Sequence, residues 1–224
     1  MSIEVKALRF AYADSPNKAI LNINHWQVTA QEQVFIHGPS GSGKSTLLNI
    51  LGGILKTSEG HVSVLNQQLN QLNSRQRDRF RAQNMGYIFQ QFNLVPYLNA
   101  VENIQLGTFF SKEKNADRSA ITTLLNELNI KNNDHYKPCS QLSIGQQQRV
   151  AIARALINKP KLLIADEASS AIDHANRDKF MQLLMALSKE QQASLLFVSH
   201  DISLSHHFQR IDAMSQINSI EAEA

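Results

Sequence analysis

Residues 38–46 read Gly38-Pro-Ser-Gly-Ser-Gly-Lys-Ser-Thr46, and no other stretch of the chain constrains the fold as strongly. The stretch matches the pattern G-x-x-x-x-G-K-[ST], in which a strand enters a glycine-rich loop and a helix leaves it. Residues 33–37 are typical of such a strand, and residues 46–55 are typical of such a helix. A Gly/Ser-rich surface turn is the simpler interpretation, but it gives no reason for Lys-Ser at the head of an apolar helix.

This loop has the chemistry to hold a nucleoside triphosphate with Mg²⁺. Glycines let successive backbone N–H groups form a concave nest, and the helix N-terminus adds positive potential. Lys44 can reach the outer phosphates, and the Ser45 hydroxyl can ligate Mg²⁺. We expect nucleotide contacts along the whole loop: Gly38, Pro39, Ser40, Gly41, Ser42, Gly43, Lys44, Ser45 and Thr46.

Length and composition predict one compact domain. The chain has 224 residues, of which 42% are hydrophobic, enough for a full core. No apolar run approaches the roughly 18 residues that cross a bilayer, and the first residues lack a signal-peptide pattern, so we expect no membrane span. The single cysteine, Cys139, excludes an internal disulfide and is typical of a reducing compartment.

The formal net charge of +3 is too small to indicate a nucleic-acid partner. The densest basic stretch has arginines at every second position of a helix expected to begin near Ser74. Residues two apart lie on different helix faces, so these side chains form no basic stripe. We therefore expect a solvated helix and no nucleic-acid binding through its arginines, Arg75, Arg77, Arg79 and Arg81.

Strand and helix patterns alternate along the rest of the chain. Short strands are expected at residues 3–10, 20–28, 61–65, 85–89, 161–165 and 194–199. Residues 99–129 have a helical period instead. A further helix separates the last two strands, and its buried stripe is predicted to be Phe180, Leu183, Leu184 and Leu187. The pattern predicts an α/β core with a helical insert between its halves.

A second chemical site follows the expected strand at 161–165, which ends in two carboxylates, Asp166 and Glu167. In parallel sheets, ligands collect at the carboxyl ends of strands, so both side chains should emerge near the phosphates bound by Lys44. Asp166 can hold Mg²⁺, directly or through water, and Glu167 can polarise the water that attacks the γ-phosphate. An Asp-Glu pair that opens an exposed helix is the alternative, which the phosphate loop disfavours.

A third motif, Leu142-Ser-Ile-Gly-Gln-Gln-Gln-Arg149, predicts the start of a helix. Ser143 followed three residues later by Gln146 has the pattern of a capping box. A helix that begins here directs its free backbone N–H groups outward, and such an end can bind an anion.

The order of these motifs resembles that of the nucleotide-binding subunit of ATP-binding cassette (ABC) transporters, over nearly the whole chain. The same family has an aromatic residue before the phosphate loop, a glutamine after a strand, a Ser-Ala-Ile-Asp loop and a Ser-His-Asp stretch after the last core strand. In this sequence these are Tyr12, Gln90, residues 170–173 and residues 199–201.

The resemblance implies the fold class and a division of the chain. The fold is expected to be an α/β P-loop NTPase (ABC ATPase) core with an N-terminal antiparallel β subdomain and an inserted α-helical subdomain. Residues 1–224 should form a single ABC ATPase domain. Its nucleotide-binding core should cover about residues 1–90 and 157–224, and its helical subdomain about 91–156.

The resemblance also implies what the site residues do. Tyr12 should stack on adenine, Gln90 should sense Mg²⁺ and the transport partner, and His200 should contact the γ-phosphate and position the attacking water. The expected catalytic residues are Glu167, His200 and Gln90. The expected Mg²⁺ ligands are Ser45, Gln90 and Asp166.

Two copies of the chain are needed in such a family, because the signature helix of one subunit closes over the phosphate loop of the other. Ser143, Gly145 and Gln146 should therefore bind ATP across a dimer interface, where Asp173 should also lie. The chain holds one copy of each motif, so the partner is expected to be a second copy or a related subunit.

The resemblance is greatest to the lipoprotein-releasing and macrolide-exporter branch, on residues 38–53 and 89–96. It implies an ATP-hydrolysing subunit that drives an integral-membrane permease, through a groove lined by residues 92–103. Such a subunit is cytoplasmic and peripheral on the cytoplasmic face of the inner membrane. An ATPase that regulates an envelope or cell-division complex without transport, or an amino-acid importer ATPase, remains an alternative. A soluble cassette that acts on DNA or ribosomes is disfavoured, because such proteins usually carry two cassettes or a long coiled coil.

Three departures from the family pattern stand out. Ile144 replaces the usual glycine of the signature, and its bulk near a closed interface should slow catalysis at most. Residues 168–169 are Ala-Ser in place of Pro-Thr, which removes no catalytic group. The tail at 210–224 lacks the usual Asp-Gly turn, and its end is expected to be frayed.

Two further sets of residues invite functional interpretations that the sequence does not favour. His200, His206 and His207 could form a metal cluster, yet no cysteine or suitably spaced carboxylate accompanies them, and residues 205–208 are expected to be an exposed helix end. Trp26 could stack on a base, but its place in an alternating strand favours the core.

Overall fold

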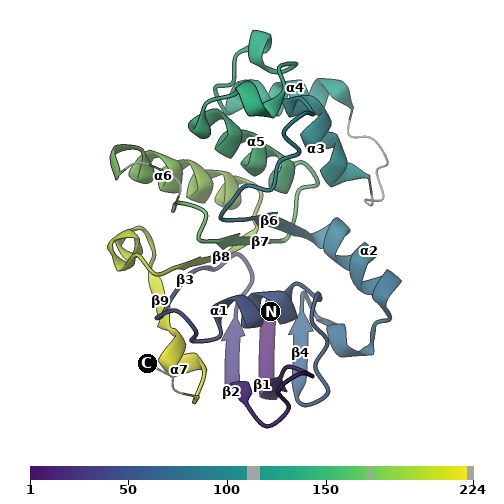
Figure 1. The fold of residues 1–224 in the computed structure, drawn as a ribbon, viewed down its shortest axis with the longest axis vertical. Coiled ribbons are helices and arrows are strands. Elements are labelled where there is room, and N and C mark those ends of the chain that lie inside the picture. The colour runs from purple at the N-terminus through teal and green to yellow at the C-terminus, as the bar shows by residue number, and fades with distance from the viewer. Residues whose placement is uncertain (110–116, 171, 173, 221–224) are drawn as a thin grey trace.

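The computed structural model describes all residues of the chain except 110–116, 171, 173 and 221–224 (Figure 1). The expected frayed end at 221–224 and the expected interface residue Asp173 therefore lie outside the described residues.

One of the two sheets is antiparallel and holds the N-terminal strands. Its order is β2-β1-β4-β5, with strands β1 (Ile3–Ala11), β2 (Ala19–Val28), β4 (His61–Val64) and β5 (Gln67–Gln68). The buried residues of β2 are Leu21, Ile23, Trp26 and Val28. Trp26 is 6% exposed and donates from Nε1 to Asp212. The core assignment of Trp26 is confirmed.

The other sheet is parallel and collects strands from both ends of the chain. Its order is β6-β7-β8-β3-β9, with strands β3 (Gln33–His37), β6 (Met85–Ile88), β7 (Leu162–Asp166), β8 (Ser194–Ser199) and β9 (Arg210–Ala213). Every pairing in this sheet is parallel, so the carboxyl ends of its strands share one edge. That edge is where the phosphate loop leaves β3 and the two carboxylates leave β7.

Helices connect and cover these strands. The structure has α1 (Lys44–Leu51), α2 (Ser74–Asn84), α3 (Ala100–Thr108), α4 (Arg118–Glu127), α5 (Ile144–Leu156), α6 (His174–Glu190) and α7 (Met214–Ile217). Short 3₁₀ helices lie at η1 (Leu69–Gln71), η2 (Asn132–Asp134), η3 (Cys139–Gln141) and η4 (Ile202–His207).

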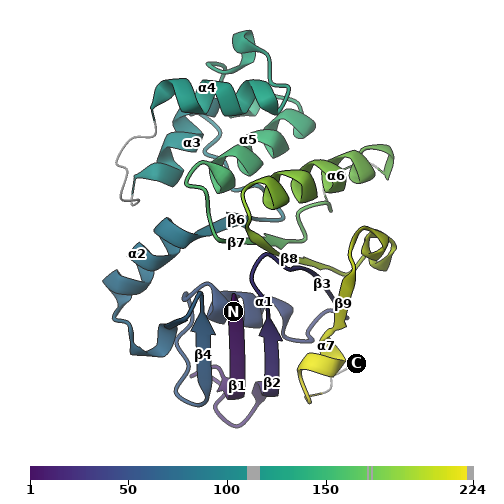
Figure 2. The ribbon, with the colours of Figure 1, turned by 180° about the vertical axis from the view of Figure 1, so that it is seen from behind.

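Two of these helices test the sequence predictions directly. Helix α1 ends at Leu51, before the expected residue 55, because Gly52 caps it and Gly53 adopts a φ of 67°. Helix α2 begins at Ser74 as expected and buries none of its residues. It lies at the flank of the molecule in Figure 2, which agrees with a solvated helix.

The parallel sheet is buried on both faces, which gives the chain its layers. Phe35 and Phe197 face a cluster that includes residues of α3, α5 and α6, whereas Val34, Ile36 and Val198 face a second cluster with α1 and the antiparallel sheet. Figure 1 shows α3, α4 and α5 on one side of the parallel sheet and the antiparallel sheet on the other. The fold class is confirmed, whereas the subdomain bounds near residues 90 and 157 stay a prediction.

Candidate active site

The phosphate loop between β3 and α1 depends on glycine for its shape. Gly41 and Gly43 have φ angles of 79° and 95°, in the left-handed region that other residues rarely adopt. A Cβ atom on Gly43 would lie 2.7 Å from Cδ2 of Leu21, and one on Gly38 would lie 2.9 Å from Cβ of Met214. The loop is therefore held between β2 and α7, and this close packing aims the N-terminus of α1 at the cavity described below.

The side chain of Lys44 is hydrogen-bonded to the phosphate loop. Its Nζ donates to the carbonyl oxygens of Gly38 at 2.7 Å and of Pro39 at 2.8 Å. Burial lowers the pKa of Lys44, and the charges of Glu167 and Asp166 partly offset this effect. The ammonium group of Lys44 therefore lies near the carboxylates of Asp166 and Glu167.

Asp166 is the last residue of β7 and is only partly exposed. Burial raises its pKa, the neighbouring charge of Glu167 raises it further, and Lys44 opposes both effects. A cation bound beside Asp166 would stabilise its ionised carboxylate. Asp166 is therefore suited to be a Mg²⁺ ligand.

Glu167 is fixed by the end of the neighbouring strand β8. Its φ of 50° is unusual for a side-chain-bearing residue, and its backbone N–H donates to Val198 at 2.9 Å. The backbone N–H of His200 donates to Oε1 at 2.9 Å, and His200 Nδ1 lies 2.9 Å from the same oxygen. Ser199 adds a longer contact of 3.3 Å to Oε2. The carboxylate is therefore oriented before any substrate arrives.

Eleven residues from five parts of the chain surround one cavity of about 420 Å³, a size typical of ligand sites. It is lined by Tyr12, Ile20, Ser40, Gly41, Gly43, Lys44, Ser45, Thr46, Asp166, Glu167 and His200. Tyr12 is 41% exposed, and its hydroxyl lies 3.0 Å from Oγ1 of Thr46. Oxygen ligands for Mg²⁺ (Ser45, Asp166) and donors for phosphates (Lys44, the loop) converge here, so the residues present fit Mg²⁺ with a nucleoside triphosphate.

Four predicted site residues support this cavity from outside its lining. Gly38, Pro39 and Ser42 shape the loop from behind, where the Ser42 hydroxyl donates to the Pro39 carbonyl at 2.8 Å. Gln90 follows β6 by two residues and is exposed. Because Ile88 pairs with Ala165, Gln90 lies at the same sheet edge as Asp166, but it does not line the cavity.

The signature residues lie around a different cavity. Ser143 caps α5, and the capping box is complete: Gln146 N–H donates to Ser143 Oγ at 3.3 Å, and Ser143 N–H donates to Gln146 Oε1 at 2.9 Å. The predicted helix start is confirmed. Ser143 and Gly145 line a second cavity of about 370 Å³ together with Ile144, Gln148, Arg149, Ile152, Ile172, Lys179, Phe180 and Leu183. Ile144 is 58% exposed, so its bulk meets solvent in the monomer.

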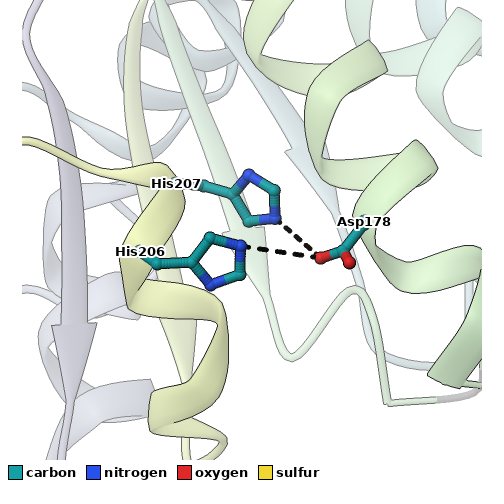
Figure 3. Close-up of side chains that lie close together, drawn as sticks. All are labelled: Asp178, His206 and His207. Carbon is teal, nitrogen blue, oxygen red and sulfur yellow. Dashed lines mark hydrogen bonds and ion pairs between the residues drawn. The ribbon is translucent and has the colours of Figure 1, made fainter.

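The rejected histidine cluster needs a correction, because the structure does bring a carboxylate to two of its members. Asp178 of α6 lies beside His206 and His207 of η4 (Figure 3). His200 contacts Glu167 instead. Spacing along the sequence could not reveal this contact, because it depends on how η4 packs against α6.

Among the residues that the structure describes, no helix is both long and apolar enough to cross a membrane.

Comparisons with known proteins agree with this geometry. A family model described as ABC transporter matches residues 21–170. The chain is 42% identical to the uncharacterized ABC transporter ATP-binding protein MJ0796 of Methanocaldococcus jannaschii, over 86% of this chain and 83% of the relative. It is 41% identical to the lipoprotein-releasing system ATP-binding protein LolD of Hydrogenovibrio crunogenus, over 83% and 80%. It is 36% identical to the macrolide export ATP-binding/permease protein MacB of Pasteurella multocida, over 95% of this chain and 33% of the relative.

A solved structure is similar over nearly the full length. The dimeric post-hydrolysis state of the cassette MJ0796, bound to ADP and phosphate, superposes with a TM-score of 0.82 at 35% identity. The match covers 99% of this chain and 97% of that one.

Proposed function

The chain belongs to the ABC transporter family, as an ATPase that uses ATP and Mg²⁺, and from this premise we propose that it works as one half of an ATP-closed dimer driving a membrane permease. The permease is of the lipoprotein-release or macrolide-export type. The complex places this subunit on the cytoplasmic face of the inner membrane.

One observation carries the dimer: the two nucleotide motifs of a single chain line two separate cavities. Lys44, Glu167 and His200 surround one, and Ser143 and Gly145 surround the other. A second copy of the chain can bring the two motifs together, because its signature can face the phosphate loop of the first copy. The dimeric state of the similar cassette MJ0796 supports the same arrangement.

The site residues then divide the work of hydrolysis among them. Lys44 exchanges the carbonyls of Gly38 and Pro39 for the outer phosphates, and this charge-assisted contact strengthens nucleotide binding. Glu167 accepts a proton from the attacking water while the N–H of His200 keeps its Oε1 in place. Asp166 and Ser45 would hold Mg²⁺, which would supply positive charge beside the phosphates.

Two further residues act from the edge of the site. Gln90, at the same sheet edge as Asp166, would serve as a further ligand of Mg²⁺. The ring of Tyr12, half exposed at the cavity mouth, stacks on adenine.

A groove of about 450 Å³ offers a docking place for the permease. It is lined by Asp78, Arg81, Ala82, Met85, Gly86, Tyr87, Phe89, Gly107, Arg154, Ala155 and Asn158, and thus mainly by α2, β6 and α5 in place of residues 92–103. Arg154 also donates to the carbonyls of Phe92 and Asn93, at 2.5 and 2.6 Å, so that segment borders the groove. Since Phe89 precedes Gln90 directly, a helix seated in the groove can influence the ATP site.

The branch of the family is proposed from the relatives named for lipoprotein release and macrolide export. The test is affinity purification of the chain from gently solubilised membranes, followed by mass spectrometry. We expect a stoichiometric permease with a large extracytoplasmic domain. Recovery from the soluble fraction alone, or with ribosomes or DNA, would overturn the proposal.

A matched pair of charge reversals tests the groove in the same experiment. Asp78→Arg changes the groove at a residue whose side chain is 58% exposed, whereas Glu190→Arg changes the exposed end of α6. Only Asp78→Arg should reduce permease recovery. Equal recovery with both variants would exclude this groove as the docking place.

A further inference from the structure

Three metal-ligating side chains converge outside the ATP site. Nε2 of His207 lies 2.9 Å from Oδ1 of Asp178, and Nε2 of His206 lies 3.7 Å from the same oxygen. The two imidazole rings lie side by side, with centroids 4.0 Å apart. Figure 3 shows both Nε2 atoms directed at the carboxylate. Two elements far apart in the sequence, α6 and η4, thus present nitrogen and oxygen atoms to one point.

A backbone contact prepares His206 to act as a ligand. Nδ1 of His206 lies 2.6 Å from the carbonyl oxygen of Ser203. A carbonyl oxygen only accepts, so Nδ1 must carry the hydrogen, and the neutral ring then keeps its lone pair on Nε2. Metal-binding histidines in proteins are fixed by the same kind of contact, which also raises the basicity of the ligating nitrogen.

The separations among the three ligand atoms are close to those of a metal site. All three atoms lie within 4.8 Å of one another. A tetrahedral ion with bonds of about 2.0–2.1 Å holds its ligand atoms roughly 3.3–3.4 Å apart. The distances of 2.9 and 3.7 Å from Asp178 Oδ1 to the two imidazole nitrogens lie on either side of this value. The site is anchored on one side, because His207 is only 10% exposed, and open on the other, because Asp178 and His206 are 61% and 62% exposed.

We propose that Asp178, His206 and His207 bind one divalent transition-metal ion of the Zn²⁺ class, with water in the remaining position. Two imidazoles and one carboxylate suit Zn²⁺ and its neighbours in the first transition row. Mg²⁺ prefers oxygen ligands, so the ion that accompanies ATP does not compete for this site. The proposal is independent of the dimer and of the permease.

The position of this site gives the ion a structural consequence. Helix η4 begins two residues after His200, and the preceding Asp201 already pairs with Arg177 of α6 at 2.7 Å. Asp178 is the residue after Arg177 in α6. A metal ion bound there would link η4 to α6 at a second point. The segment that carries His200 would therefore be more rigid when the metal is bound.

Calorimetric titration of the nucleotide-free full chain with Zn²⁺ tests the proposal, and Co²⁺ provides a spectroscopic check through its visible bands. We expect one ion per chain and tetrahedral Co²⁺ bands. His206→Ala and Asp178→Asn should each weaken Zn²⁺ binding by at least about 10–100-fold, the loss seen when even an outer-shell partner is removed. Both residues are exposed, so neither change should disturb folding, which circular dichroism verifies.

Two control variants each remove one imidazole elsewhere. His25→Ala changes an exposed residue of β2, and His200→Ala changes the ATP site. Both should bind Zn²⁺ as the unmodified chain does. The proposal would be overturned by the absence of saturable binding, by undiminished binding in His206→Ala and Asp178→Asn, or by loss of binding in His200→Ala. Loss of Zn²⁺ binding when Mg²⁺ is added in tenfold excess would also exclude an imidazole site.

Discussion

The glycines of the two nucleotide motifs differ in what they do for the monomer. Gly43 of the phosphate loop has a φ of 95°, and an added Cβ would lie 2.7 Å from Leu21. An added Cβ on Gly145 of the signature would meet no atom of the described residues within 4 Å, and its backbone is ordinary helix. The fold itself requires the first glycine. The fold of the monomer does not require Gly145, which lies on a surface that is open to a partner.

The side chains of the two regions show the same difference. Around the phosphate loop, the charges of Asp166 and Glu167 act on the pKa of Lys44, and those of Glu167 and Lys44 act on the pKa of Asp166. Around the signature, Ser143 and Gln146 satisfy each other in a capping box and leave the helix N-terminus facing outward. One region is the proposed catalytic centre, and the other is the surface proposed to close over it.

Glu167→Gln should have the largest effect, because it removes the proposed base while keeping the shape of the side chain. We expect kcat to fall by about 10²–10⁴-fold, the usual contribution of a general base. ATP should still bind, since the phosphate loop is unchanged. Steady-state ATPase assays measure the loss, with Glu127→Gln at the exposed end of α4 as the control. An unchanged kcat would remove Glu167 from catalysis.

Lys44→Ala should come next and act on binding. The lost charge-assisted contacts are worth about 1.5–3 kcal/mol, so the Kd for ATP should rise by about 10–100-fold. Equilibrium titration with a fluorescent ATP analogue measures this change, and Lys189→Ala, exposed on α6, should leave it unaltered. If Lys44→Ala bound ATP normally, the region around the phosphate loop would not be the ATP site.

Alanine substitutions at Gly43 and Gly145 should change the stability of the monomer in opposite directions. Gly43→Ala should lower the free energy of unfolding by about 1–3 kcal/mol, because of the contact with Leu21 and the left-handed backbone. Gly145→Ala should raise it by about 0.5–1 kcal/mol, because alanine favours the helix. Urea denaturation of the nucleotide-free chain measures both. Equal losses would show that the monomer also needs Gly145.

The pKa of Asp166 predicts the smallest effect. Burial and the charge of Glu167 raise this pKa in the folded chain, so the folded state loses stability as the pH rises from the ordinary pKa of aspartate through the raised pKa. Asp166→Asn should therefore raise the Tm of the nucleotide-free chain slightly at pH 7. The gain should vanish at pH values below the ordinary pKa of aspartate, where both states are protonated. Thermal melts across pH measure this, and a gain that grew on acidification would contradict the assignment.

Local patterns predicted much of the fold. The bounds of β3 were expected from the phosphate loop that follows it, the bounds of β8 from a short apolar run, and the start of α5 from its capping box. The expected end of α1 was wrong, because Gly52 and Gly53 stop the helix although the apolar pattern continues to Leu55. These features depend on neighbours in the chain, and the sequence contains them.

Contacts between distant segments could not be predicted in this way. Asp178 meets His206 and His207 only because of how η4 packs on α6. Likewise, the sequence does not distinguish Gly43 from Gly145. Only the structure shows that a Cβ atom on Gly43 would contact Leu21, whereas one on Gly145 would contact nothing within 4 Å among the described residues. The family motifs predicted most of the residues that line the ATP cavity, whereas the place of Gln90 at its edge required the strand order.

Sedimentation analysis in the presence of ATP tests whether the signature acts on the phosphate loop of another copy. Glu167→Gln with ATP should sediment as a dimer of the 25.1 kDa chain. Glu167→Gln combined with Gly145→Asp should bind ATP equally well yet stay monomeric, because Gly145 has room for a side chain in the monomer. An undiminished dimer in the double variant, or loss of ATP binding by its monomer, would contradict the account.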